Sequence, residues 1–214
     1  ANELRVKADT GKPENSRWYT GGGLFRDVRL IVTHPQLYFT RHSLHVTTPE
    51  VNDRQATIDI LTEVECLLKT DSLRFQVTII DDKNTPVVSE SPSIAFNRRM
   101  KCYEYHLPVF TLRQPHLWDT EHPRLYTVQL KLLQKDGSVA DSISQTFGIR
   151  TVTFSPDGGL TLNGKKVILK GIANHHTLGA LGAAAYPRAI EKRIQLMKEY
   201  GINHIRTSHK DRKS

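Results

Sequence analysis

Apolar and polar residues alternate in short runs from about residue 35 to residue 147, and no part of this region keeps a helical period. Turn-forming residues separate the runs, as in Asp81-Asp82-Lys83-Asn84 and Lys135-Asp136-Gly137. About 110 residues with about seven short runs are typical of an antiparallel β-sandwich. We therefore predict a mainly β chain with an immunoglobulin-like sandwich at residues 37–148, whose strands include 43–48, 55–62, 73–81, 103–109, 126–133 and 142–147.

The first 36 residues contain two further alternating runs. Residues 4–8 alternate apolar and polar side chains, and Val28, Leu30 and Val32 alternate within residues 24–32. Two or three strands bury too little apolar surface to form a domain. We expect residues 1–36 to be the C-terminal part of a preceding β-domain.

The pattern changes after residue 148. Asn163-Gly164 predicts a hairpin turn, residues 167–171 form an apolar run, and residues 202–206 form another. Between these two runs, a helix is expected to begin near Pro187 and to end at Gly201. Its apolar face should hold Ile190, Ile194 and Met197, while water should surround Glu191, Arg193, Lys198 and Glu199.

Strand, loop, helix and strand in this order make a βαβ unit. Parallel strands are normally covered on both faces, and one helix covers only one. We therefore predict that residues 149–214 are the incomplete start of a larger α/β domain. The unit should expose apolar surface, pack on another copy or be poorly ordered.

Charge and cysteine content change this interpretation little. The net charge is +8, but the 30 lysines and arginines are scattered, so we expect a solvated basic surface and no nucleic-acid partner. No apolar run approaches the roughly 20 residues of a membrane span, so we expect no membrane partner. Cys66 and Cys102 are either two buried thiols or an inter-sheet disulfide.

Histidines follow both strands of the βαβ unit, where binding and catalytic residues gather in α/β folds. His175 and His176 are neighbours that point in different directions in extended backbone, so we expect no metal site with His209. The alternatives are contacts to a hydroxylated ligand or packing. Arg206, if buried, must pair with carboxylates or carbonyls. Trp18 is either a sugar-stacking platform or a packed aromatic side chain.

Three groups of motifs resemble the β-galactosidase/β-glucuronidase family of glycoside hydrolases, family 2. Arg17-Trp18-Tyr19 with residues 23–30 resembles the end of its N-terminal jelly-roll domain. Residues 117–126, with Leu117-Trp118-Asp119 and His122-Pro123-Arg124-Leu125-Tyr126, resemble a stretch of its sandwich domain. Residues 147–150, 162–165, 170–176, 196–198 and 203–209 resemble the entry to its catalytic (β/α)8 barrel.

This resemblance implies a fragment of a retaining exo-glycosidase, similar to a β-galactosidase. It implies that the two catalytic glutamates lie outside this chain, so the fragment should be inactive and holds no catalytic residue. It also implies a carbohydrate substrate, no required cofactor and no assignable cation ligands. Self-association stays open. The substrate-binding positions that match are His175, His209, Asn174 and Arg206.

The sequence departs from the family pattern at a few positions. Thr177 stands where an acidic residue is common, Lys210 follows His209 in place of Asn-Pro, and the first family proline is missing from residues 118–123. The alternative from another class is a non-catalytic β-sandwich module that binds protein or carbohydrate.

Overall fold

The protein is described by a computed structural model covering residues 3–9, 24, 27–96, 104–175, 177–182, 184 and 186–207. Its contacts divide the chain into two compact units. One comprises residues 31–167, and the other comprises residues 1–30 and 168–214. The domain limits at 36/37 and 148/149 were predicted from changes in the sequence pattern, whereas these units are defined by contacts. The predicted limits therefore stay predictions.

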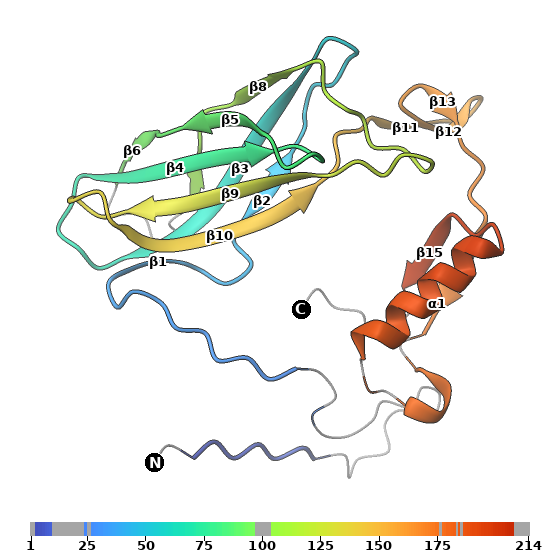
Figure 1. The fold of residues 1–214 in the computed structure, drawn as a ribbon, viewed down its shortest axis with the longest axis horizontal. Coiled ribbons are helices and arrows are strands. Elements are labelled where there is room, and N and C mark those ends of the chain that lie inside the picture. The colour runs from blue at the N-terminus through green and yellow to red at the C-terminus, as the bar shows by residue number, and fades with distance from the viewer. Residues whose placement is uncertain are drawn as a thin grey trace. The chain divides into compact units, whose positions relative to one another are not determined.

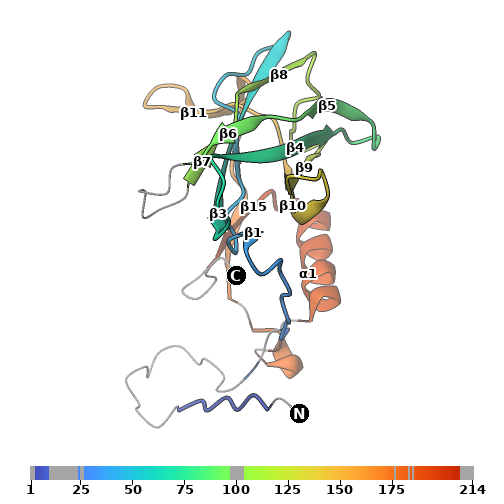
Figure 2. The ribbon, with the colours of Figure 1, turned by 90° about the vertical axis from the view of Figure 1, so that its left-hand side faces the viewer.

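The larger unit is a sandwich of two antiparallel sheets, drawn as two layers in Figures 1 and 2. One sheet is built on β3 (Gln55–Cys66), which pairs with β1 (Leu37–Phe39), β2 (His45–Thr47), β7 (Glu104–His106) and β8 (Phe110–Arg113). The other sheet consists of β4 (Ser72–Ile80), β5 (Pro86–Glu90), β6 (Ser93–Ala95), β9 (Tyr126–Leu133) and β10 (Val139–Phe147). Its strand order is β10-β9-β4-β5, and β6 also pairs with β4.

The core of the sandwich comes from strict alternation in its three longest inner strands. Every second residue of β3, β4 and β9 is buried, because successive side chains of a strand point to opposite faces. Phe75 lies between Phe39 and Tyr105, with ring centroids 6.4 and 6.3 Å away. The fully buried side chains include Ile58, Ile60, Val64, Phe75, Val77, Ile79, Val128, Leu130 and Leu132.

Comparison with the predicted strands shows where pattern reading failed. All six strands predicted for the sandwich are present, although β3 continues to Cys66 and β1, β5, β6 and β8 were not predicted. The strands predicted at 4–8 and 24–32 are wrong, because residues 4–8, 24 and 27–32, the part of these ranges that the structure describes, have no regular structure. No described residue supplies the antiparallel partner that such strands need, and Leu4 and Leu30 are 81% and 91% exposed.

A small sheet follows the sandwich in the same unit. It holds β11 (Val152–Ser155), β12 (Gly159–Leu162) and β13 (Lys165–Lys166), in that order. The predicted turn joins β12 to β13: Asn163 and Gly164 have φ of 50° and 74°, and Leu162 pairs with Lys165. Such paired positive φ values match the twist of a two-residue hairpin.

Asn163 also joins this sheet to the sandwich. Its Oδ1 accepts a hydrogen bond from the Thr151 N–H at 3.0 Å, and its Nδ2 donates to the Trp118 carbonyl at 2.9 Å. The Arg150 guanidinium lies 4.8 Å from the centre of the Trp118 ring. A Cβ at Gly148 would lie 2.9 Å from that side chain, so the position needs glycine. The motif around Trp118 is therefore a packing joint.

Asp82, in the turn after β4, has two basic partners. Its carboxylate lies 3.1 Å from His116 Nδ1 and 3.8 Å from Arg124 Nε. The hydrogen bond with His116 and the charge of Arg124 hold the pKa of the Asp82 carboxyl below its ordinary value. The His116 N–H donates to the hydroxyl of Tyr126, whose pKa is raised by burial. The cluster fixes the segment before β9.

The other unit contains the predicted βαβ arrangement. It consists of β14 (Gly171–Asn174), the 3-10 turn η1 (Gly179–Leu181), the helix α1 (Pro187–Glu199) and β15 (His204–Thr207). β14 and β15 pair in parallel, as predicted, and Figure 1 shows α1 running beside them. The first strand begins at Gly171, where the prediction had it end. Cys66 is a free buried thiol, and Cys102 lies outside the described residues.

Replacing Phe75 with alanine should cost about 3–5 kcal/mol of unfolding free energy, because a fully buried ring leaves a cavity between the sheets. Chemical denaturation of the purified chain measures this loss. Phe154→Ala is the matched control, since its ring is 80% exposed, and it should change stability by less than about 0.5 kcal/mol. A loss below about 1 kcal/mol for Phe75→Ala would contradict the position of the core.

Asp82→Asn should lower the urea midpoint at about pH 5.5, and the difference from wild type should shrink as the pH falls further. A carboxyl whose folded pKa is depressed stabilises the fold above its unfolded pKa, ordinarily 3.8, and loses this contribution as the pH falls through the folded pKa. Urea titrations from about pH 5.5 to about pH 2 measure the effect. The control is Asp157→Asn, whose carboxylate makes no ion pair with a described residue. Parallel curves for wild type and Asp82→Asn would contradict the pairing.

Candidate functional site

The parallel pair brings the C-terminal ends of two strands to one edge. Gly171 pairs with His204, Ala173 with Arg206, and Asn174 with Thr207. His175 follows directly and is half-buried, as is Asn174. The structure therefore places Asn174, His175 and Arg206 at the edge where ligands bind in parallel α/β folds.

Asn203 fastens the opposite end of the pair. Its Oδ1 accepts from the Lys170 N–H at 2.8 Å, and its Nδ2 donates to the Ile168 carbonyl at 3.0 Å. Its own N–H donates to the Lys170 carbonyl. At Gly171 a Cβ would lie 2.7 Å from the His204 ring and 3.2 Å from its carbonyl oxygen. The strands approach closely here only because residue 171 is glycine.

The ends of α1 follow the predicted signals. Pro187 is the first helical residue, where its missing N–H costs nothing. Gly201 has φ of 76°. Its N–H donates to the Lys198 carbonyl, while the Ile202 N–H donates to that of Met197. This pair of bonds is the Schellman motif, which satisfies the last helical carbonyls and turns the chain into β15.

Arg193 contradicts the prediction that it faces water. From α1 its guanidinium donates to Asn174 Oδ1 at 3.1 Å, to the His175 carbonyl at 2.9 Å and to the Thr177 carbonyl. Its position on the polar side of the helical pattern hid this role. The only signal in the sequence is that arginine, with five donors in one plane, suits several carbonyls better than lysine does.

Arg206 lies on the other face of the strand pair. Asn174 bonds to α1, side chains alternate along a strand, and Arg206 pairs with Ala173, the residue before Asn174. Arg206 therefore points away from α1. Arg206 is exposed, and it makes no ion pair with any described residue. The condition under which the sequence required a partner for Arg206, burial of its side chain, is therefore not met in the described part of the chain.

Several candidate residues fall outside the described part. His176, His209 and Trp18 lie there, so what was expected of them stays a prediction. Within the described residues, no group of three or more histidine, cysteine, aspartate or glutamate side chains could hold a metal ion. No helix in these same residues is long and apolar enough to span a membrane.

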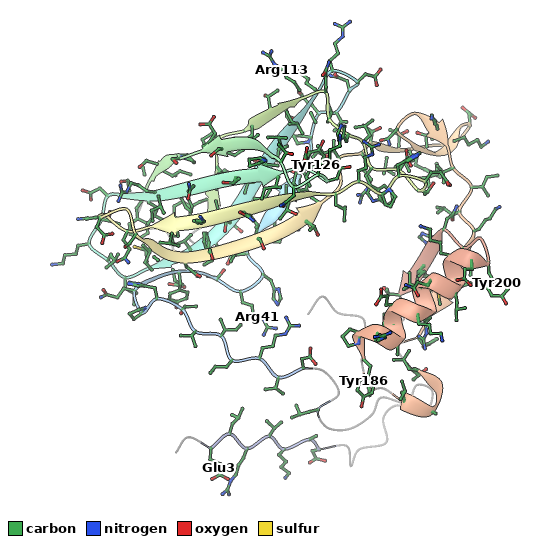
Figure 3. All side chains as sticks on the ribbon, in the orientation of Figure 1. Glu3, Arg41, Arg113, Tyr126, Tyr186 and Tyr200 are labelled. Atoms are coloured by element: carbon green, nitrogen blue, oxygen red, sulfur yellow. The ribbon has the colours of Figure 1, made fainter. Side chains whose placement is uncertain are left out.

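Apolar side chains of the βαβ unit are exposed, which confirms one of the outcomes predicted for an incomplete α/β domain. Tyr186 and Tyr200, at the two ends of α1, project into solvent (Figure 3). An open groove of about 480 Å³ runs along the helix. Its lining is mainly apolar and consists of Leu178, Leu181, Ala189, Lys192, Arg193, Leu196, Met197, Tyr200 and Ile202.

Comparison with known proteins relates the sandwich and the βαβ unit to one family. Residues 40–150 match the model of "Glycosyl hydrolases family 2". Residues 155–213 match "Glycosyl hydrolases family 2, TIM barrel domain". The chain belongs to glycosyl hydrolase family 2. The predicted immunoglobulin-like domain followed by the start of a TIM barrel is confirmed.

Relatives within family 2 include a β-galactosidase of Bacteroides ovatus, 35% identical over 97% of this chain and 24% of that protein. A β-glucuronidase of Bacteroides fragilis is 28% identical over 97% of this chain and 31% of that protein. A family 2 crystal structure from Bacteroides cellulosilyticus DSM 14838 superposes with a TM-score of 0.85 at 34% identity, covering 92% of this chain and 27% of that one. The chain thus spans about a quarter of the length of such relatives.

Within the family 2 barrel, β14 and β15 lie in the segment matched to the TIM-barrel model. TIM-barrel enzymes bind substrate at the C-terminal face, in the loops that follow the strands. The edge formed by Asn174, His175 and Arg206 corresponds to that face. The histidine that the motif placed after the second strand, His209, is not described.

Asn203→Ala should loosen the N-terminal end of the strand pair, because it removes two hydrogen bonds to the segment before β14. Each bond contributes about 1 kcal/mol and about 1.4 kcal/mol is a factor of ten, so the loss of both should speed deuterium exchange of the Lys170 amide about thirtyfold. Hydrogen exchange read by NMR checks this. Gln195→Ala, which removes an amide on the exposed surface of α1, should leave that rate unchanged. Equal rates in Asn203→Ala and wild type would count against the fastening role.

Proposed function

We propose that this chain forms part of a retaining exo-glycosidase that removes a terminal β-linked galactose or a related sugar such as glucuronate. The observation that carries the proposal is the pair of parallel strands whose C-terminal edge presents Asn174, His175 and Arg206 inside a match to the family 2 barrel. Relatives named β-galactosidase and β-glucuronidase support the two sugars.

The proposed role of Asn174 and His175 is to bind sugar hydroxyl groups. Both side chains are half-buried at the strand end, where a bound sugar would replace water on one side. An amide and an imidazole each offer a donor or an acceptor to a hydroxyl. A site built on such bonds rejects sugars whose hydroxyls do not match, because a buried polar group is then left unpaired.

Arg206 is proposed to support the pocket from the face away from α1. A guanidinium there attracts carboxylates, and in a retaining glycosidase the two catalytic carboxyl groups stand about 5–5.5 Å apart across the sugar. Residues 168–207 contain two glutamates, Glu191 and Glu199, and both lie on α1. Neither glutamate lies at the strand edge. This supports the proposal that the catalytic glutamates lie outside the 214 residues.

The proposal predicts that the 214-residue chain does not hydrolyse nitrophenyl β-galactoside or β-glucuronide, whereas the product of the complete reading frame hydrolyses at least one of them. The first sugar released should be the β-anomer, as double displacement requires. Release of nitrophenol measures the rate, and NMR of early product identifies the anomer. Turnover by the 214-residue chain, an inverted product, or inactivity of the complete protein on both substrates would each overturn the proposal.

In the complete protein, His175→Ala should raise KM by about tenfold or more, because one hydrogen bond to the bound sugar is lost from a partly dry site. Glu191→Gln on the exposed surface of α1 is the control and should leave both constants unchanged.

A further inference from the structure

Among the described residues, Arg193 ties α1 to the strand edge, although sequence patterning assigned this side chain to the solvent. Arg193 reaches from the middle of α1 to three acceptors that follow one another along the chain, Asn174 Oδ1, the His175 carbonyl and the Thr177 carbonyl. Two of its nitrogens take part, so the plane of the guanidinium is fixed from two directions. A side chain held in this way is not free to follow a substrate.

Arg193 bonds to the segment that follows the last residue pair of the strand ladder. The ladder between β14 and β15 ends at the Asn174–Thr207 pair. In the described residues, backbone hydrogen bonds resume where the Leu178 N–H donates to the Gly182 carbonyl. Arg193 bridges the interval between these two points, which contains His175. A charged donor makes a stronger hydrogen bond than a neutral one does, so Arg193 orders this interval more firmly than a neutral side chain would.

The same contact fixes the chemistry of Asn174. A guanidinium only donates, so the amide atom that faces Arg193 must be the oxygen. The amide Nδ2 is then the atom that remains for a ligand. Asn174 is thereby set as a donor toward a sugar oxygen, and it cannot turn over to act as an acceptor without losing the bond to Arg193.

We propose that Arg193 is a positioning residue of the sugar site: it holds the backbone of His175 in place and orients the amide of Asn174, without contacting the sugar. This inference rests on the proposed function. Lysine cannot replace arginine here, because one ammonium group does not reproduce two planar nitrogens directed at three oxygens.

The first test uses the product of the complete reading frame and its variants Arg193→Met, His175→Ala and the double variant. Arg193→Met should lower kcat/KM at least about tenfold, as expected for lost charged hydrogen bonds. Because the part of the Arg193→Met loss that passes through His175 is already absent in His175→Ala, the double variant should fall below His175→Ala by less than Arg193→Met falls below wild type; the loss that remains passes through Asn174. Arg193→Lys should recover only part of the loss, and Arg188→Met, an exposed arginine of the same helix, should match wild type.

Independent losses that multiply in the double variant, or full activity in Arg193→Met, would overturn the positioning role. A purely structural role for Arg193 predicts multiplied losses, so the comparison separates the two. If Arg193→Met does not fold, the partial recovery in Arg193→Lys and its double variant with His175→Ala supply the same comparison.

The second test needs no activity. In the 214-residue chain, hydrogen exchange at the Leu178, Leu181 and Gly182 amides reports the order of the segment, since each donates a backbone hydrogen bond. Arg193→Met should speed this exchange at least about tenfold, while Arg188→Met and the β9 amides of the sandwich stay at wild-type rates. Unchanged exchange would overturn the inference even if the enzyme is active. If Arg193→Met speeds exchange in the 214-residue chain but the complete protein hydrolyses neither glycoside, the proposed function is rejected. The role of Arg193 in ordering the segment is then retained.

Discussion

The interlocking of alternate side chains from β3, β4 and β9 between two sheets is the constraint on which the larger unit depends. It determines which face of each strand is inside, and therefore the register of every shorter strand that pairs with them. A one-residue slip would bring polar neighbours into the place of Phe75 and Ile58. The turns and the joint around Trp118 and Asn163 are polar details added to that frame.

The βαβ unit is held by a different kind of interaction. None of the residues of α1 is buried, so apolar packing contributes less there than in the sandwich. Polar side chains bonded to backbone take a larger share: Asn203 at the start of the strand pair and Arg193 at its end. Such bonds are directional, and they fix the position of a loop more sharply than a nonspecific apolar contact does.

Local signals predicted the sandwich, the Asn163-Gly164 hairpin, the start of α1 at Pro187 and the turn at Gly201 that follows its end, because each depends on neighbours in sequence. Strands at residues 4–8 and 24–32 were predicted wrongly, since alternation does not show whether a partner strand is present. The role of Arg193 could not be read from the sequence either. Its partners lie 16 to 19 residues away, and only the return of α1 along the strand pair brings them within reach.

The register of the strand pair assigns different faces to the residues that the family motif groups together. Asn174 and Thr207 lie on the side of α1, whereas Ala173 and Arg206 lie on the other side. The small Ala173 leaves space beside the long Arg206 side chain. In a closed barrel the side opposite the helices is the interior, so Arg206 would act from within it. Asn174 would reach a sugar only beyond the strand end, and there its direction depends on Arg193. The helix thus takes part in shaping the site without entering it.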